Sequence, residues 1–178
     1  GTIVIPVFID DVDDPEVSLA SSAFKPVWSV VRALREHDDD LAEQLDELRR
    51  SKGRSGSGKL KLPSKIKFVL PKRIGRDFAL AFESKLVDSS TASWEEWYGR
   101  LLVFVEQEGH ALVKHAYKDS NGYALGSWCY TQRAALNSEQ LSAERIKRLE
   151  EVDGWVWDLS SAHWEKGYAS LLAFVEQE

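Results

Sequence analysis

The stretch from Gly53 to Lys59 has the spacing G-x-x-x-x-G-K, in which backbone N–H groups can bind nucleotide phosphates. Leu60 follows at the place where this motif needs a serine or threonine hydroxyl for magnesium. A phosphate loop must also follow a buried strand and begin a helix, whereas a charged helical pattern precedes this stretch and Pro63 soon follows it. We therefore predict no nucleotide site and interpret residues 51–58 as a glycine–serine linker.

Other side chains that could do chemistry do not combine into a site. Two runs of acids, at residues 10–14 and 38–40, carry the oxygen ligands that magnesium and calcium prefer. Neither run has the glycine and terminal glutamate of a calcium-binding loop, so we expect these acids to act as caps. The histidines are His37, His110, His115 and His163. Their spacing offers no zinc-binding pair and no catalytic triad with Cys129, which we expect to be a small buried residue. The sequence thus predicts no catalytic residue, no metal site and no enzyme activity for this chain.

The composition is that of a soluble globular protein. The 178 residues are 43% hydrophobic and 29% charged, which excludes a collagenous, low-complexity or disordered chain. A single cysteine excludes a disulfide-stapled scaffold and a cysteine-based zinc finger, and it fits a cytoplasmic protein. No apolar run reaches the roughly 20 residues of a membrane span, so we expect no membrane contact. Because the sequence contains no methionine, we expect it to be a fragment of a longer protein.

Charge is distributed unevenly along the chain, whose formal net charge is -6. The segment charges are -5 for residues 1–58, +5 for residues 59–90, -4 for residues 91–160 and -2 for residues 161–178. From Arg49 to Arg76 there are eleven bases and no acid, and we call this segment the basic stripe. Such a stripe on an acidic protein suits a polyanion such as nucleic acid, but it is equally typical of a solvated linker.

Hydrophobic periodicity predicts a mainly helical chain with a minor β element. The dense β-branched runs Thr2–Ile9 and Ile66–Leu70 are predicted strands. Apolar residues at helical spacing predict helices over residues 22–36, 39–50, 75–87, 93–108, 124–136 and 142–152. We expect Gly109 to end the fourth of these helices and Ser142 to cap the last. The tryptophans expected in the core are Trp94, Trp97, Trp128 and Trp157.

An internal repeat organises the second half of the chain. The segment Trp94–Glu108 recurs as Trp164–Glu178, with ten identities in fifteen positions at an offset of 70 residues. Self-similarity at this level is typical of tandem domains. The second copy stops after its first helix, so we expect the natural protein to continue beyond Glu178.

The first repeat contains several spaced motifs, which are Gly109-His110, Leu125-Gly126-x-Trp128-x-x-x-Gln132-Arg133, Leu141-Ser142 and Trp155-Val156-Trp157. With these motifs, residues 94–157 resemble the helicase-associated domain, a repeat found in tandem copies after bacterial helicase motors. The resemblance implies a three-helix bundle and a role in binding nucleic acid.

The first 50 residues contain Gly1-Thr-Ile-Val-Ile-Pro-Val-Phe-Ile9, Ser22-Ala-Phe-Lys-Pro-Val-Trp28 and Ala33-Leu-Arg-Glu-His-Asp38. They resemble the tail of the second motor domain of DEAD/DEAH-type helicases. The resemblance implies a parent ATP-dependent helicase that uses ATP and Mg2+ and whose ATPase motifs lie upstream of Gly1. Because those motifs are absent from this sequence, we expect the chain to hold no cofactor and to hydrolyse no ATP.

These observations predict four segments and a fold class. The segments are a motor-domain tail (1–50), a basic linker with a short strand and helix (51–90), a helicase-associated three-helix domain (91–160) and the first helix of a truncated second repeat (161–178). The predicted fold is mainly α with a minor β element, in which strand–helix–helix precedes a three-helix bundle. The predicted partners are DNA or RNA and the helicase motor domains of the same chain, without a membrane, in the bacterial cytoplasm.

The candidate nucleic-acid-binding residues are basic side chains of the first repeat and of the basic stripe, which can contact phosphates. They are Arg133, Arg145, Lys147, Arg148, Lys114, Lys118, Lys59, Lys61, Lys65, Lys72 and Arg73. Tyr117 or Tyr123 would stack on a base. The alternative is a docking module without autonomous nucleic-acid binding, in which the arginines pair with neighbouring acids and the basic stripe docks against the acidic repeats.

Overall fold

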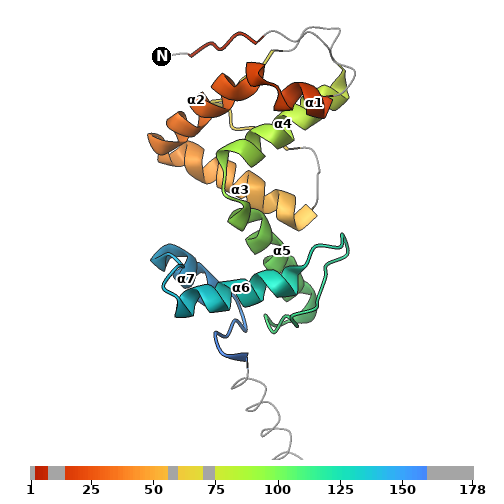
Figure 1. Cartoon of the computed structure of the whole chain (residues 1–178), viewed down its shortest axis with the longest axis vertical. Helices are drawn as coiled ribbons and strands as arrows, with labels where there is room; N and C mark the ends of the chain where they lie inside the picture. Colours follow the sequence, from red (N-terminus) through yellow and green to blue (C-terminus); the bar gives the residue numbers. More distant parts are fainter. Residues whose placement is uncertain (1–2, 8–14, 56–59, 70–74, 160–178) are drawn as a thin grey trace, which may run out of the picture. The chain divides into compact units, whose positions relative to one another are not determined.

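The computed structural model describes residues 3–7, 15–55, 60–69 and 75–159, and these residues are mainly helical, as predicted (Figure 1). The helices are α1 (Pro15–Ala20), the 3-10 helix η1 (Ser22–Phe24), α2 (Lys25–Glu36), α3 (Asp39–Ser55), α4 (Arg76–Ser90), α5 (Ser93–Glu108), α6 (Leu125–Asn137) and α7 (Ala143–Glu150). The chain divides into two units, residues 1–99 and 100–178, with the boundary inside α5. Within the described ranges, no helix is long and apolar enough to cross a membrane. The expected helix of the second repeat lies outside the described residues.

The helices predicted from periodicity are confirmed, with small shifts at their ends. Gly109 ends α5 with a φ of 72°, and the hydroxyl of Ser142 caps α7 by accepting the Arg145 N–H at 3.4 Å. Helix α1 is not predicted, because the acids before it indicate a loop. It begins at Pro15, and proline suits a first helical position, where the missing N–H would have no intrahelical acceptor.

The predicted strands are wrong where the structure describes them. Residues 3–7 and 66–69 are extended but belong to no strand, and the rest of both predictions lies outside the described residues. A strand needs a neighbouring strand for its ladder hydrogen bonds, and the described elements around these segments are helices. Ile5 and Val7 pack against the helical core, whereas Val4 is 81% exposed. The apolar runs therefore cover helices and form no sheet in the described part of the chain.

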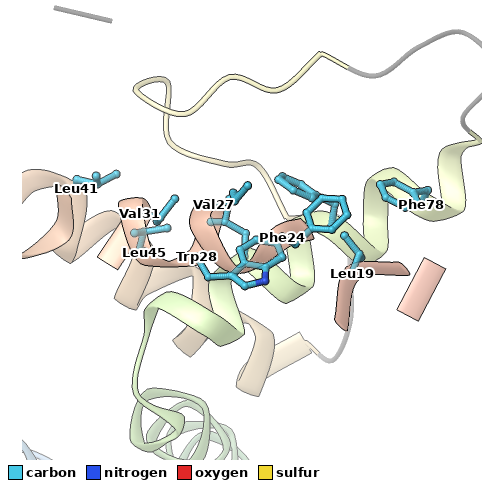
Figure 2. Packing of buried hydrophobic residues seen from close by; sticks show 10 residues of the cluster. Leu19, Phe24, Val27, Trp28, Val31, Leu41, Leu45 and Phe78 are labelled. Atoms are coloured by element: carbon cyan, nitrogen blue, oxygen red, sulfur yellow. The ribbon is translucent and has the colours of Figure 1, made fainter. Parts of the chain in front are cut away.

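Aromatic and aliphatic side chains from several helices form the core of the first unit (Figure 2). The rings of Phe24 and Trp28 stack at 5.8 Å between centroids, and Phe82 of α4 lies 5.5 Å from Trp28. Leu45 of α3 is fully buried in the same cluster. Phe68, from the extended segment before α4, lies 4.8 Å from Phe82. Helix α4 and this segment therefore share one core with α2 and α3.

Helix α3 continues to Ser55, so the predicted glycine–serine linker is wrong over its described part, and its remainder lies outside the described residues. A Cβ atom on Gly53 would lie 2.0 Å from the carbonyl oxygen of Glu96. A Cβ atom on Gly99 would lie 2.2 Å from the carbonyl oxygen of Arg50. Each glycine thus faces the backbone of the other helix, and α3 and α5 approach more closely than any side chain would permit. We call this contact the α3–α5 crossing.

In the second unit, glycines let the segments between helices pack closely against the start of α6 and against one another. A Cβ atom on Gly126, at the start of α6, would lie 1.9 Å from the carbonyl oxygen of Lys114. Gly154 has a φ of +73°, and a Cβ atom there would lie 3.1 Å from the nitrogen of Ala111. The fully buried side chains come from helices and connecting segments alike, and include Leu101, Val113, Leu125, Cys129 and Leu149. The three predicted helices are present, and their arrangement as a bundle stays a prediction.

The tryptophans divide between core and boundary. Trp94 is buried as expected, whereas Trp97, Trp128 and Trp157 are half-buried. The indole of Trp157 donates to a carboxylate oxygen of Glu150 at 3.1 Å. Because indole is large and carries a polar N–H, partial burial with a hydrogen bond is its usual position.

Candidate nucleic-acid interface

The first three bases of the basic stripe lie in α3 and pair with acids of α4 and α5. The pairs are Arg49 with Asp88 and with Glu96 at 2.9 Å, Arg50 with Glu95 at 3.1 Å and Lys52 with Asp88 at 2.7 Å. Arg49 and Glu95 are buried, so removing one partner would leave an uncompensated charge away from water. These bases are engaged by the protein itself: Arg49 and Arg50 lie across the α3–α5 crossing, and Lys52 joins α3 to α4.

Lys65 is also engaged by an acid. Its Nζ lies 2.7 Å from both carboxylate oxygens of Asp38, which caps α3 by accepting the Leu41 N–H at 3.0 Å. The hydrogen bond from Lys65, followed by that from Leu41, lowers the pKa of Asp38, and Asp38 in turn raises the pKa of Lys65. Asp38 thus caps a helix as expected, while residues 10–14 lie outside the described residues. In the described ranges, no group of three His, Cys, Asp or Glu side chains could hold a metal ion.

The remaining bases of the stripe divide into two groups. Arg54, Lys61, Lys67 and Arg76 are exposed. The candidates Lys59, Lys72 and Arg73 lie outside the described residues. Of the candidates in the stripe, Lys61 is therefore described and open to solvent, whereas Lys65 has an acid as its partner.

Arg133 lies inside the second unit and is 7% exposed. Its Nε donates to the Val156 carbonyl at 2.8 Å and its Nη2 to the Ala111 carbonyl at 3.4 Å. The guanidinium carbon lies 4.2 Å from the centroid of a Trp155 ring, in cation–π geometry. Burial lowers the pKa of Arg133. Arg133 is therefore an internal brace between connecting segments. Its guanidinium is buried and bonded to carbonyls, so we no longer interpret Arg133 as a phosphate ligand.

The bases of α7 are Arg145, Lys147 and Arg148. The Lys147 side chain is 78% exposed and its Nζ lies 3.8 Å from Glu151. Arg148 lies 3.8 Å from Glu144, one helical turn away. These contacts agree with the alternative of a solvated helical face. The Lys147–Glu151 pair is exposed, and such pairs contribute about 0–1 kcal/mol, so a phosphate could replace Glu151 at little cost. The Arg148 side chain is only 19% exposed.

The segment between α5 and α6 carries two exposed lysines, Lys114 and Lys118. Within the part of the chain that the structure describes, neither pairs with an acid. The single acid from Gly109 to Asn137 is Asp119, which accepts a 2.7 Å bond from the buried guanidinium of Arg100. Arg100 thus compensates the charge of Asp119 from inside, and the two lysines dominate the charge at the surface.

Several aromatic rings lie in this segment or in the two helices that it joins. Tyr117 packs edge-on against Phe104 at 4.8 Å, so this predicted stacking ring is used inside the protein. Tyr123 is 44% exposed and has the Arg100 guanidinium carbon 3.5 Å from its centroid. Tyr130 of α6 is 58% exposed, and the ring of His115 stands edge-on to it at 5.0 Å. His115, whose ring contacts Tyr130, directly follows Lys114 in the sequence, and the exposed Tyr123 lies in the same connecting segment as both lysines.

The helices α5 to α7, the glycine contact at the start of α6 and the internal arginine all fall in one stretch of sequence. Residues 91–158 match the family model of the helicase associated domain. The match includes α5, α6, α7 and the segments between them, and it is consistent with an accessory region of a helicase. Searches of curated proteins and of solved structures found no match to the chain.

The most specific motif of the helicase associated domain has a structural explanation in this chain. Leu125 is fully buried, Gly126 admits the backbone of the preceding segment, and Arg133 braces two carbonyls. Gln132 is 7% exposed. The Leu-Gly-x-Trp-x-x-x-Gln-Arg motif therefore holds the domain together and presents no surface of its own at these four positions.

Three residues of the matched segment are not among the candidates identified from the sequence. They are Arg100, His115 and Tyr130. Arg100 is paired and buried, which residue type alone does not indicate. A signal for the other two is the rarity of acids from Gly109 to Asn137 in an otherwise acidic domain. A local deficit of acids marks a surface on which weak cationic sites are not cancelled.

Cys129 of α6 is fully buried, and burial raises the pKa of its thiol to about 12. Because the thiolate is the reactive form, we expect no reaction with Ellman's reagent at pH 7.5 in the native protein and one thiol per chain after unfolding in urea. Rapid reaction of the native protein would show that the core around α6 opens readily.

Proposed function

We propose that this chain is the accessory nucleic-acid-binding region of an ATP-dependent helicase and that it holds DNA or RNA by phosphate contacts next to the motor. The observation that carries the proposal is the exposed pair Lys114 and Lys118 in a stretch whose single acid, Asp119, is already paired with Arg100. The family match of residues 91–158 supports the helicase context.

The charge of the domain limits how it can bind. Residues 91–160 carry eleven acids against seven bases, so an extended electrostatic footprint is not available. Binding must come from a few local contacts, at Lys114 and Lys118, at Lys147 with Arg145 and Arg148 on α7, and at Lys61 in the basic stripe. Tethering to a motor that already grips the strand raises the effective concentration, so weak contacts suffice.

The test is a salt titration of oligonucleotide binding to the full chain, followed by fluorescence anisotropy. We expect affinity to fall with salt, and the Lys114→Ala, Lys118→Ala double variant to reduce the log–log slope by about 1.4 on single strands. Lys85→Ala, which removes an exposed lysine of α4, is the matched control and should leave the slope unchanged. Charge reversal at Arg145, Lys147 and Arg148 should also weaken binding; an unchanged affinity would remove α7 from the proposal.

A second candidate function is intramolecular docking, and the α3–α5 crossing favours it. Buried ion pairs and two glycines attach the first turns of α5 to α3, and these turns begin the matched domain. In this function, bases of the basic stripe pair with acids of the same chain and do not contact nucleic-acid phosphates. Absence of salt-dependent binding to DNA and RNA at low ionic strength, with the chain folded, would leave docking as the function.

The wider assignment belongs to the same proposal. The parent is a bacterial DEAD/DEAH-type helicase in the cytoplasm, residues 1–50 are the tail of its second motor domain, and tandem helicase-associated repeats follow as three-helix bundles. ATP and Mg2+ are cofactors of the parent motor, and this region hydrolyses no ATP. The nucleotide-dependent step would take place elsewhere in the parent, while this region holds the strand.

A further inference from the structure

The outward side of α6 carries no charged residue. Ser127, Tyr130, Thr131 and Ala134 are exposed and follow one another at helical spacing, and we call them the Tyr130 face. Helix α6 contains no aspartate or glutamate. The protein as a whole has a net charge of -6, but the Tyr130 face carries no acid. No side chain on this face therefore repels a polyanion.

We propose that the Tyr130 face binds single-stranded nucleic acid, with a base stacked on Tyr130 and the flanking phosphates near Lys114 and Lys118. This inference rests on the proposed function and adds the class of nucleic acid and the residue that contacts the base. Tyr130 has the exposure that stacking requires, since 58% of the residue is open to solvent.

The segment with the two lysines is fixed against the start of α6. The Gly126 N–H donates to the Tyr117 carbonyl at 3.1 Å, and the absence of a Cβ on Gly126 admits the Lys114 carbonyl. Lys114 and Lys118 lie at either end of this contact in the sequence. Both lysines therefore project from a short segment whose backbone is packed against the start of α6.

Tyr130 already has one ring contact before any ligand binds. The His115 ring stands edge-on to it at an interplanar angle of 87°, and its backbone belongs to a helix. A contact that restricts the ring reduces the conformational entropy lost when a base stacks on it. The chemistry favours a single strand, because the faces of bases are covered by their neighbours in a duplex and open in an unpaired strand.

The test compares Tyr130→Ala with the unchanged full chain on three labelled probes at low salt: oligo(dT), an abasic oligomer of the same length and a duplex. We expect Tyr130→Ala to weaken oligo(dT) binding about tenfold and to leave binding of the abasic oligomer unchanged. Tyr130→Trp should preserve oligo(dT) binding, because it keeps a stacking ring. Thr131→Ala is the control, because it changes the same face without removing an aromatic ring, and it should leave oligo(dT) binding unchanged. Thermal melting should be unaffected by these exposed substitutions, which separates lost contact from lost fold.

Other outcomes overturn the inference in distinguishable ways. If Tyr130→Ala binds oligo(dT) as the unchanged chain does, the stacking site is wrong while the proposed function stands. Tighter binding of the duplex than of oligo(dT) would contradict the single-strand preference. If the unchanged chain binds none of the probes, the proposed function itself fails, and the Tyr130 face is left to a protein partner.

Discussion

Replacing Gly53 or Gly99 by alanine should destabilise the first unit by about 3 kcal/mol, although alanine is the better helix former by about 1 kcal/mol. Each new methyl carbon would lie within 2.2 Å of a backbone carbonyl oxygen of the facing helix. A backbone atom cannot rotate away as a side chain can, so the helix axes must separate. Separation would also lengthen the Arg49–Glu96 and Arg50–Glu95 ion pairs, which lie across the same contact.

The measurement is urea unfolding of the full chain, followed by far-ultraviolet circular dichroism. Gly75→Ala is the matched control, since a Cβ atom on Gly75 meets nothing within 4 Å. That change should cost less than about 1 kcal/mol, at the beginning of α4. If Gly53→Ala and Gly99→Ala are neutral or stabilising, helix propensity outweighs the clash, and the close α3–α5 crossing is not maintained in solution.

The same crossing shows why one sequence interpretation succeeded and another failed. Apolar periodicity located the helices because each one buries a stripe against its neighbours. Gly53 lies in a stretch rich in glycine and serine, and this composition indicates a flexible linker. Glycine also permits close helix contacts, and only the position of α5 distinguishes the two uses. The strand predictions were wrong for a related reason, because a strand depends on a hydrogen-bonding partner that is distant in sequence.

The identification of binding residues from the sequence also depends on contacts between distant residues. Sequence identifies basic side chains, but it does not say which of them the protein neutralises itself. Arg49 and Lys65 resemble Lys61 as members of the basic stripe, yet acids engage the first two. The sequence signal that would have singled out Lys114 and Lys118 is the scarcity of acids from Gly109 to Asn137, because a missing counter-charge is visible before any contact is known.

Replacing Arg133 by alanine should destabilise the second unit by about 3 kcal/mol, the scale of a lost charged hydrogen bond together with a lost cation–π contact. The change would leave the Val156 and Ala111 carbonyls without their donor and one face of Trp155 without its partner. Unfolding can be followed by tryptophan fluorescence, and by the rate at which the buried Cys129 thiol reacts, because that thiol lies in the second unit.

Arg133→Lys distinguishes the brace from a phosphate ligand. If Arg133 contacted phosphate, lysine would preserve the charge, most of the affinity and the stability. As a brace, Arg133 needs the planar guanidinium, because a single ammonium cannot reach two carbonyls and also lie flat on an indole. We therefore expect Arg133→Lys to speed Cys129 reaction nearly as much as Arg133→Ala, whereas Lys147→Ala, at an exposed base, should leave the thiol protected. Full protection in Arg133→Lys, with nucleic-acid affinity lost in Arg133→Ala, would return Arg133 to the binding surface.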